Sequence, residues 1–195
     1  MNLRLHRALS WLKKAEETSE DLDIQFITLW ITFNAIYAKE FATERTVDRI
    51  GFIEFINDIC RLDTDKKIYK IIWQHFPQNI RVMLDNQYIF QPFWYYQNGK
   101  ISEKAWKEDF EKANKKARTA LNNQDAIDML IVIFDRLYTL RNQLVHGGAT
   151  YHSQVNRLQL KDGCQILLAI IPKIIQIILD NPENNWGKPF YPLVV

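Results

Sequence analysis

Apolar residues recur at helical spacing along nearly the whole chain, and the two-residue alternation of a half-buried strand is almost absent. Near the start, Leu5, Leu9, Leu12 and Ala15 follow one another at intervals of three or four residues, which puts them on one face of a helix. The pattern therefore predicts an all-α fold.

Three long helices are expected to build the core. A helix over 23–41 has bulky apolar residues on nearly every side, so it is predicted to be central or to lie in a subunit interface. A second runs from capping residues at 122–125 to His146, where the pair Gly147-Gly148 is typical of the turn just past a helix C-terminus. The last begins at 155 or 160 and ends near 179.

The middle of the chain is less regular. Short helices are predicted over 47–62 and 65–76, with a break at Pro77. A helix over 102–121 has one apolar line and many lysines on its outer side, interspersed with acids. That outer side is interpreted as a solvated face, and a surface that follows phosphates is the alternative.

The segment 88–96 gathers rings and aliphatic side chains around Pro92. Because so many rings are costly to leave in water, we expect a loop or short turn packed on the core. A platform on which unpaired bases stack is the alternative interpretation.

The length of 195 residues fits a single domain, which would bury roughly 70% of the surface of its unfolded chain. We expect one up-and-down helical bundle over 1–195, with its core in about 1–42 and 124–180. A helical insertion over about 43–123 and a tail over 181–195 would complete it.

Composition sets limits on partners and cofactors. The net charge of +2 is too small to indicate a general polyanion-binding surface, so a nucleic acid would have to meet a local patch. Cys60 and Cys164 lie far apart, with no cysteine or histidine at ligand spacing. We therefore expect two reduced thiols and no metal, cofactor or disulfide.

A cytoplasmic location is expected. The first twelve residues resemble the start of an amphipathic helix and not a signal peptide. The most apolar stretch, 166–179, is interrupted by Pro172 and Lys173 and is shorter than the roughly 20 residues of a membrane span. We predict a buried helix there and no membrane partner.

The candidate chemistry lies at the end of the helix that stops at His146. Asn142 and His146 are four residues apart and share a face. Arg141 is turned from His146 by about 140° and displaced by about 7.5 Å along an ideal helix. A long arginine and an unwound last turn can bridge that gap, so the three can line one small cavity.

These residue types suit cleavage of RNA without a metal. An imidazole can exchange protons near neutrality, and a guanidinium is a permanent, planar donor for phosphate. The 2′-hydroxyl of RNA supplies the nucleophile, so a protein need only move protons and stabilise charge. The structural alternative is a helix-end histidine bonded to a carbonyl, with Arg141 in an ion pair with Asp135 or Asp162.

The stretch Leu140-Arg141-Asn142-Gln143-Leu144-Val145-His146-Gly147 resembles the signature of the HEPN superfamily, in which an arginine and a polar residue precede a histidine. The helix around 29–37, the two glycines and the tail 180–192 are similar to the Apea-like HEPN group. The likeness covers both ends of the chain and hardly touches 43–123.

The resemblance implies a helical bundle of HEPN type that dimerises, so that arginine and histidine of both copies face a shared cleft. Many members are metal-independent endoribonucleases of toxin–antitoxin, abortive-infection and other phage-defence systems, and they leave 2′,3′-cyclic phosphate and 5′-hydroxyl ends. It implies that His146 is the acid and base, Arg141 the phosphate clamp and Asn142 the residue that orients them, with RNA and an antitoxin or neighbouring defence protein as partners.

Two alternatives belong to other classes of protein. One is a catalytically silent HEPN module that binds RNA, a nucleotide or a protein. The other is a helical interaction protein in which the motif is structural.

Family toxins that are silenced by nucleotidyl transfer have a tyrosine two residues after the histidine, where this chain has Gly148. The resemblance therefore does not carry that form of control over to this chain. Further binding candidates are Asn34 on the second helix, and His152 and Arg157 beyond the glycines. Each also has a structural interpretation: the amide would satisfy a buried backbone group, and the other two would be ordinary loop residues.

Overall fold

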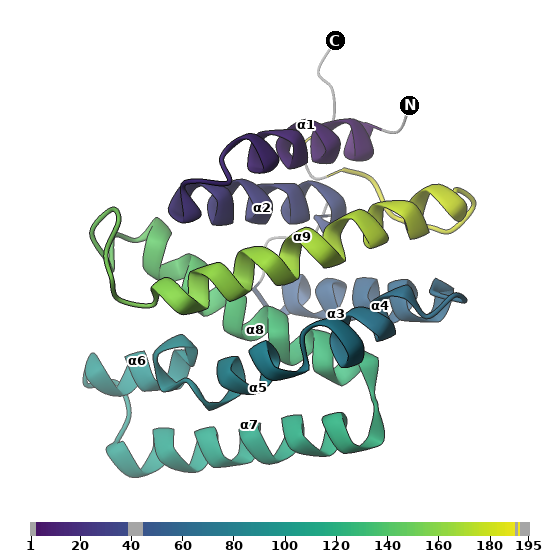
Figure 1. The fold of residues 1–195 in the computed structure, drawn as a ribbon. Helices are drawn as coiled ribbons and strands as arrows, with labels where there is room; N and C mark the ends of the chain where they lie inside the picture. The colour runs from purple at the N-terminus through teal and green to yellow at the C-terminus, as the bar shows by residue number, and fades with distance from the viewer. Residues whose placement is uncertain (1–2, 39–44, 190, 192–195) are drawn as a thin grey trace. The chain divides into compact units, whose positions relative to one another are not determined.

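A computed structural model describes residues 3–38, 45–189 and 191, and the backbone alone for 45–48. The described part contains nine α-helices and two short helical segments, and it has no β-strand (Figure 1). The predicted all-α class is therefore confirmed. The elements are α1 (Leu3–Glu17), α2 (Leu22–Tyr37), α3 (Arg45–Leu62), α4 (Lys67–Lys70), η1 (Ile71–His75), α5 (Pro77–Asp85), η2 (Gln87–Ile89), α6 (Gln91–Gln97), α7 (Glu103–Asn123), α8 (Ala126–Val145) and α9 (Arg157–Asp180).

The long helices lie where the apolar spacing predicts them, with small differences at their ends. α2 ends at Tyr37, and Phe41, its expected end, lies outside the described residues. The single short helix expected over 65–76 is divided into α4 and the π-helical segment η1, because Phe76 donates its N–H five residues back to Ile71 at 3.2 Å.

The prediction of a loop over 88–96 was wrong, although its packing was right. The segment forms η2 and then α6, with Pro92 in the first turn of α6, where a missing N–H costs nothing. Ile89 and Phe93 are buried, as expected of a ring-rich segment. The proline therefore starts a helix here and does not interrupt one.

The chain divides into two compact units. Unit 1 comprises 1–68 and 164–195, and unit 2 comprises 69–163. The dividing points fall within α4 and α9. The prediction of a single domain with an insertion over 43–123 stays a prediction.

In unit 1, α1 packs against α2, and Figure 1 shows the two helices side by side. Arg4 is buried and donates to the carbonyl of Ile36 at the end of α2 and to that of Gly187 in the tail, the latter at 3.2 Å. Burial lowers the pKa of this guanidinium. The charged side chain thus joins the two termini of the unit.

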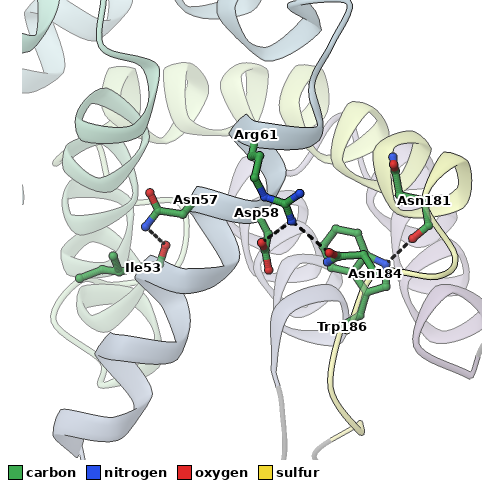
Figure 2. A network of polar contacts seen from close by, with 7 residues as sticks. All are labelled: Ile53, Asn57, Asp58, Arg61, Asn181, Asn184 and Trp186. Carbon is green, nitrogen blue, oxygen red and sulfur yellow. Dashed lines mark hydrogen bonds and ion pairs between the residues drawn. The ribbon is translucent and has the colours of Figure 1, made fainter.

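A polar network holds the C-terminal tail to the end of α3 (Figure 2). Arg61 lies between Asp58, at 2.8 Å, and the side-chain oxygen of Asn184, at 3.0 Å. The indole of Trp186 donates to the carbonyl of Asn181 at 2.9 Å, and its ring meets Phe55 edge-on. These contacts fix residues 181–186 on unit 1.

In unit 2, α7 packs against α5, α6 and α8, and the shared point of contact is Arg136 on α8. Its guanidinium is 3% exposed, donates at 3.2 Å to the Leu84 carbonyl on α5 and to the Asn114 side chain on α7, and lies 4.4 Å from the ring of Phe90 and 5.4 Å from that of Phe110. Burial lowers its pKa to about 10, so it stays charged at neutral pH.

By length and composition alone, α9 could cross a membrane, with a mean hydropathy of 1.7 over its most apolar window. This is weak evidence, because 61% of that window is buried inside the protein and core helices of soluble proteins pass the same test. Burial of the segment 166–179 is as predicted. Cys164 on this helix is buried and Cys60 on α3 is half-buried.

Replacement of Arg136 tests how much unit 2 depends on it. Arg136→Ala removes two hydrogen bonds and two ring contacts and leaves a cavity, so the free energy of unfolding should fall by about 3 kcal/mol. Arg136→Met fills most of that volume without a buried charge and should cost about 1 kcal/mol. Urea unfolding followed by circular dichroism measures both. If Arg136→Ala lowered the free energy of unfolding by less than about 1 kcal/mol, unit 2 would not depend on Arg136 in the way its contacts indicate.

Candidate functional site

Helix α8 has a defined beginning and end. Asp125 caps its N-terminus, with its side chain accepting from the N–H of Asp128 at 3.0 Å. At the other end Gly148 donates to the carbonyl of Gln143 at 2.7 Å and Gly147 to that of Leu144 at 3.2 Å. This pair of bonds is the Schellman motif, and Gly147 takes the left-handed conformation that it needs, with φ +68°.

One face of α8 near its end is partly exposed. Tyr138, Arg141, Asn142 and Val145 follow the helical spacing of zero, three, four and seven residues, so they form a single stripe. Tyr138 and Val145 at the two ends of the stripe are 47% and 48% exposed. Arg141 and Asn142 between them are half-buried.

The predicted pair Arg141 and Asn142 is brought together. Nη1 of Arg141 donates to Oδ1 of Asn142 at 3.0 Å. The Nε of Arg141 is buried and has no hydrogen-bond partner. In the part of the chain that the structure describes, no carboxylate lies within ion-pair distance of this guanidinium.

The alternative in which Arg141 is a structural ion-pair partner is therefore not what the structure shows. Asp162 is buried and accepts from the Asn79 side chain at 2.8 Å. Because no carboxylate of the described chain neutralises Arg141, its guanidinium has capacity for an anion from outside that part of the chain.

His146 is the residue at which α8 ends. Its N–H donates to the carbonyl of Asn142 at 3.0 Å, so the backbone is fixed one turn beyond the Arg141–Asn142 pair. The side chain is exposed, and within the described residues its imidazole makes no hydrogen bond. The histidine is thus positioned by the backbone and its ring is accessible.

Gln143 is a contact point that the sequence did not single out. Its side-chain N–H donates to the carbonyl of Tyr88, and its Oε1 accepts from the Asn156 side chain at 2.7 Å. The same Tyr88 carbonyl accepts from the indole of Trp94 at 2.7 Å. The end of α8 is therefore attached to the η2 segment and to the loop before α9. The only sequence signal was a glutamine inside the motif.

The remaining binding candidates are His152 in the loop before α9, Arg157 at the start of α9 and Asn34 on α2. His152 is exposed, has φ +57° and lies with its ring 4.1 Å from that of Tyr151. Arg157 donates through Nε to the carbonyl of Ser153 at 3.1 Å, which holds the loop before α9. Asn34 is half-buried on α2 and belongs to unit 1, whereas the other candidates belong to unit 2.

The tight turn after His146 also explains the residue at 148. A Cβ atom there would lie 3.1 Å from the carbonyl oxygen of Gln143 and 3.3 Å from its Cα. Both are helix backbone atoms that have little freedom to move. The turn accommodates glycine and leaves little room for a larger side chain at this position.

Comparison of the chain with protein-family models, with curated proteins and with solved structures finds no match. The likeness to HEPN proteins thus depends on the residues of the motif and its surroundings.

The two glycines should differ in which substitutions they tolerate. Gly147→Ala should cost about 1 kcal/mol because of its positive φ, and Gly147→Asn less, since asparagine adopts that conformation more readily. Gly148→Ala should cost about 1 kcal/mol because the new methyl group presses on the backbone of Gln143. Thermal and urea unfolding measure these differences. If Gly148→Ala left the free energy of unfolding unchanged, the turn would be able to widen around the new methyl group.

Proposed function

We propose that this protein is a metal-independent endoribonuclease of HEPN type, which cleaves RNA at a site formed by Arg141, Asn142 and His146. The observation that carries the proposal is the half-buried Arg141, which is held by Asn142 and has no carboxylate within ion-pair distance in the described part of the chain. It lies five residues before an accessible histidine at the end of the same helix. A phosphate is the ligand that this arrangement suits best.

The proposed reaction is an internal transfer at phosphorus. The 2′-oxygen forms a bond to the phosphorus atom as the bond from phosphorus to the 5′-oxygen breaks, which leaves a 2′,3′-cyclic phosphate and a 5′-hydroxyl. One imidazole takes the proton of the 2′-hydroxyl, and a protonated imidazole gives a proton to the departing 5′-oxygen. Arg141 stabilises the negative charge on the non-bridging oxygens, and Asn142 keeps its guanidinium in place.

Two imidazoles serve this reaction better than one, and each chain offers a single His146. A two-fold dimer would bring two histidines and two arginines to one cleft. The stripe on α8 supports this arrangement, because exposed apolar side chains at Tyr138 and Val145 flank the proposed site. We therefore propose that this stripe faces a second copy of the chain.

A silent RNA-binding module is the second candidate function. It is favoured by one specific observation, namely that no group in the described chain orients the imidazole of His146 by a hydrogen bond. The same phosphate clamp would then retain RNA without cutting it.

Cleavage should persist when metal ions are chelated, and it should be lost when either His146 or Arg141 is replaced. Single-stranded RNA incubated with the purified protein in excess EDTA should yield 5′-hydroxyl ends, which a polynucleotide kinase labels without phosphatase treatment. His146→Ala should lower the rate by about 10²–10⁴-fold and Arg141→Ala by about 10²–10³-fold. An RNA with a 2′-deoxy residue at the cleaved position should remain intact, because it lacks the nucleophile.

Matched controls exist within the same unit. His75 and Arg81 are exposed and lie outside the proposed site, so His75→Ala and Arg81→Ala should cleave at the wild-type rate. His146→Ala should unfold within about 1 kcal/mol of wild type, since little apolar area is lost. Retention of RNA without cleavage by the wild type would favour the silent module, and cleavage by His146→Ala at the wild-type rate would refute the assignment.

The dimer is tested by mass in solution. Light scattering should give twice the 23.2 kDa of one chain. Tyr138→Glu should lower the mass toward one chain, because two carboxylates would meet near the symmetry axis. Tyr95→Glu changes an equally exposed tyrosine on α6 and should leave the dimer intact. A single-chain mass for the wild type at micromolar concentration would contradict the proposal.

A further inference from the structure

A polar groove lies beside the end of α8, entirely within unit 2. It has a volume of about 510 Å³, which falls within the range of about 300–1,000 Å³ of small-molecule sites. One wall is the end of α5 and η2, and the other is the loop before α9 with the first turn of α9. The lining residues are Asp85, Asn86, Gln87, Tyr88, Val155, Asn156 and Gln159.

The chemistry of the groove is unlike that of a phosphate site. Its lining has no cation and one carboxylate, that of Asp85, which would repel an anion. Four side chains are carboxamides, each of which offers both donors and an acceptor. This combination suits a neutral ligand whose edge alternates donors and acceptors.

Much of that hydrogen-bonding capacity is still available. Asn86 uses its oxygen to accept from the N–H of Tyr88 at 2.8 Å, which leaves its amide donors. Asn156 donates to Gln143 and retains its oxygen. In the described part of the chain, the side chains of Gln87 and Gln159 make no hydrogen bond.

An aromatic ring completes the groove. Tyr88 is 48% exposed and its ring meets that of Phe93 edge-on at 5.4 Å, so the ring is supported on one side while the residue remains open to solvent. Its own carbonyl, and not its hydroxyl, makes the contacts to Gln143 and Trp94. The exposed ring is therefore available for stacking on a planar ligand.

Gln143 connects the groove to the proposed cleavage site. Gln143 follows Asn142 directly on α8, and it bonds one residue from each wall, Tyr88 and Asn156. A polynucleotide whose phosphate lies at Arg141 would thus have a neighbouring base within reach of the groove.

We propose that this groove binds one base of single-stranded RNA, stacked on Tyr88 and hydrogen-bonded along its edge by the carboxamides, and that it sets the base preference of the protein. Unpaired bases are recognised in this way, by a ring on the face and amides on the edge. The inference rests on RNA being the ligand of the proposed site, but not on cleavage.

Binding is tested apart from cleavage. Fluorescein-labelled ten-residue oligomers of A, C and U are titrated against His146→Ala protein in EDTA, and anisotropy gives the dissociation constants. Tyr88→Ala in that background should weaken binding of the preferred oligomer by about tenfold, whereas Tyr88→Phe, which keeps the ring, should stay within about twofold. Gln159→Ala should reduce the difference among the three oligomers.

Control variants change the same residue types elsewhere in unit 2. Tyr95→Ala and Gln97→Ala remove an exposed tyrosine and glutamine of α6 that do not line the groove, and should leave all three affinities unchanged. Gln159→Ala removes no hydrogen bond within the described chain, so it keeps the test decisive if Tyr88→Ala fails to fold, which its melting temperature would show.

The outcomes separate the two proposals. Equal losses with Tyr88→Ala and Tyr95→Ala, or no base preference in any variant, overturn the base-binding groove even if the wild type cleaves RNA. A specific loss with Tyr88→Ala, together with a wild type that never cleaves, supports the groove and refutes the nuclease. If the protein binds none of the oligomers, or if only a peptide or protein competes for the groove, the inference falls.

Discussion

A positive charge that has been removed from water organises unit 2. Arg136 has no carboxylate at ion-pair distance in the described chain and is stabilised by two ring faces, a helix-end carbonyl and an amide. Burying a cation costs free energy, and here the compensating groups come from α5, α7 and the residue that follows η2, while the buried Nε has no hydrogen-bond partner in the described chain. The charge is therefore favourable only when these elements assemble together.

That constraint extends to the candidate site. Phe90, one of the two rings against Arg136, is two residues from Tyr88, whose carbonyl accepts from Gln143. Arg136 and Gln143 both belong to α8, so the helix meets the 88–90 segment at two points two turns apart. The position of the Arg141–Asn142 pair thus follows from how α8 is held, and not only from the local sequence.

Local signals were enough to predict most of the helices. Apolar spacing predicted the all-α class, Ser102 caps α7 through the N–H of Ala105 at 3.2 Å, and the glycine pair marks the end of α8. The segment 88–96 was misjudged because a proline is compatible with a loop and with a first helical turn. Which of these forms depends on tertiary burial of Ile89 and Phe93, which the local sequence does not encode.

The site was predictable only in part, for a similar reason. Arg141 and Asn142 are adjacent in sequence, so their pairing could be anticipated, whereas the contact between Gln143 and Tyr88 joins residues 55 positions apart. Arg136 did leave a signal, since it shares a helix face with the buried Ile133 and Leu140. A charged residue in an apolar stripe indicates that buried groups stabilise the charge, but the local sequence does not identify those groups.

The way α8 ends gives His146 a fixed backbone and an exposed ring that no hydrogen bond holds in the described chain. A ligand that requires the imidazole in one orientation must remove that freedom, at a cost of about 0.5–1.5 kcal/mol for an immobilised side chain. The side-chain entropy of His146 is therefore lost only when a ligand binds, and this loss lowers the affinity for that ligand.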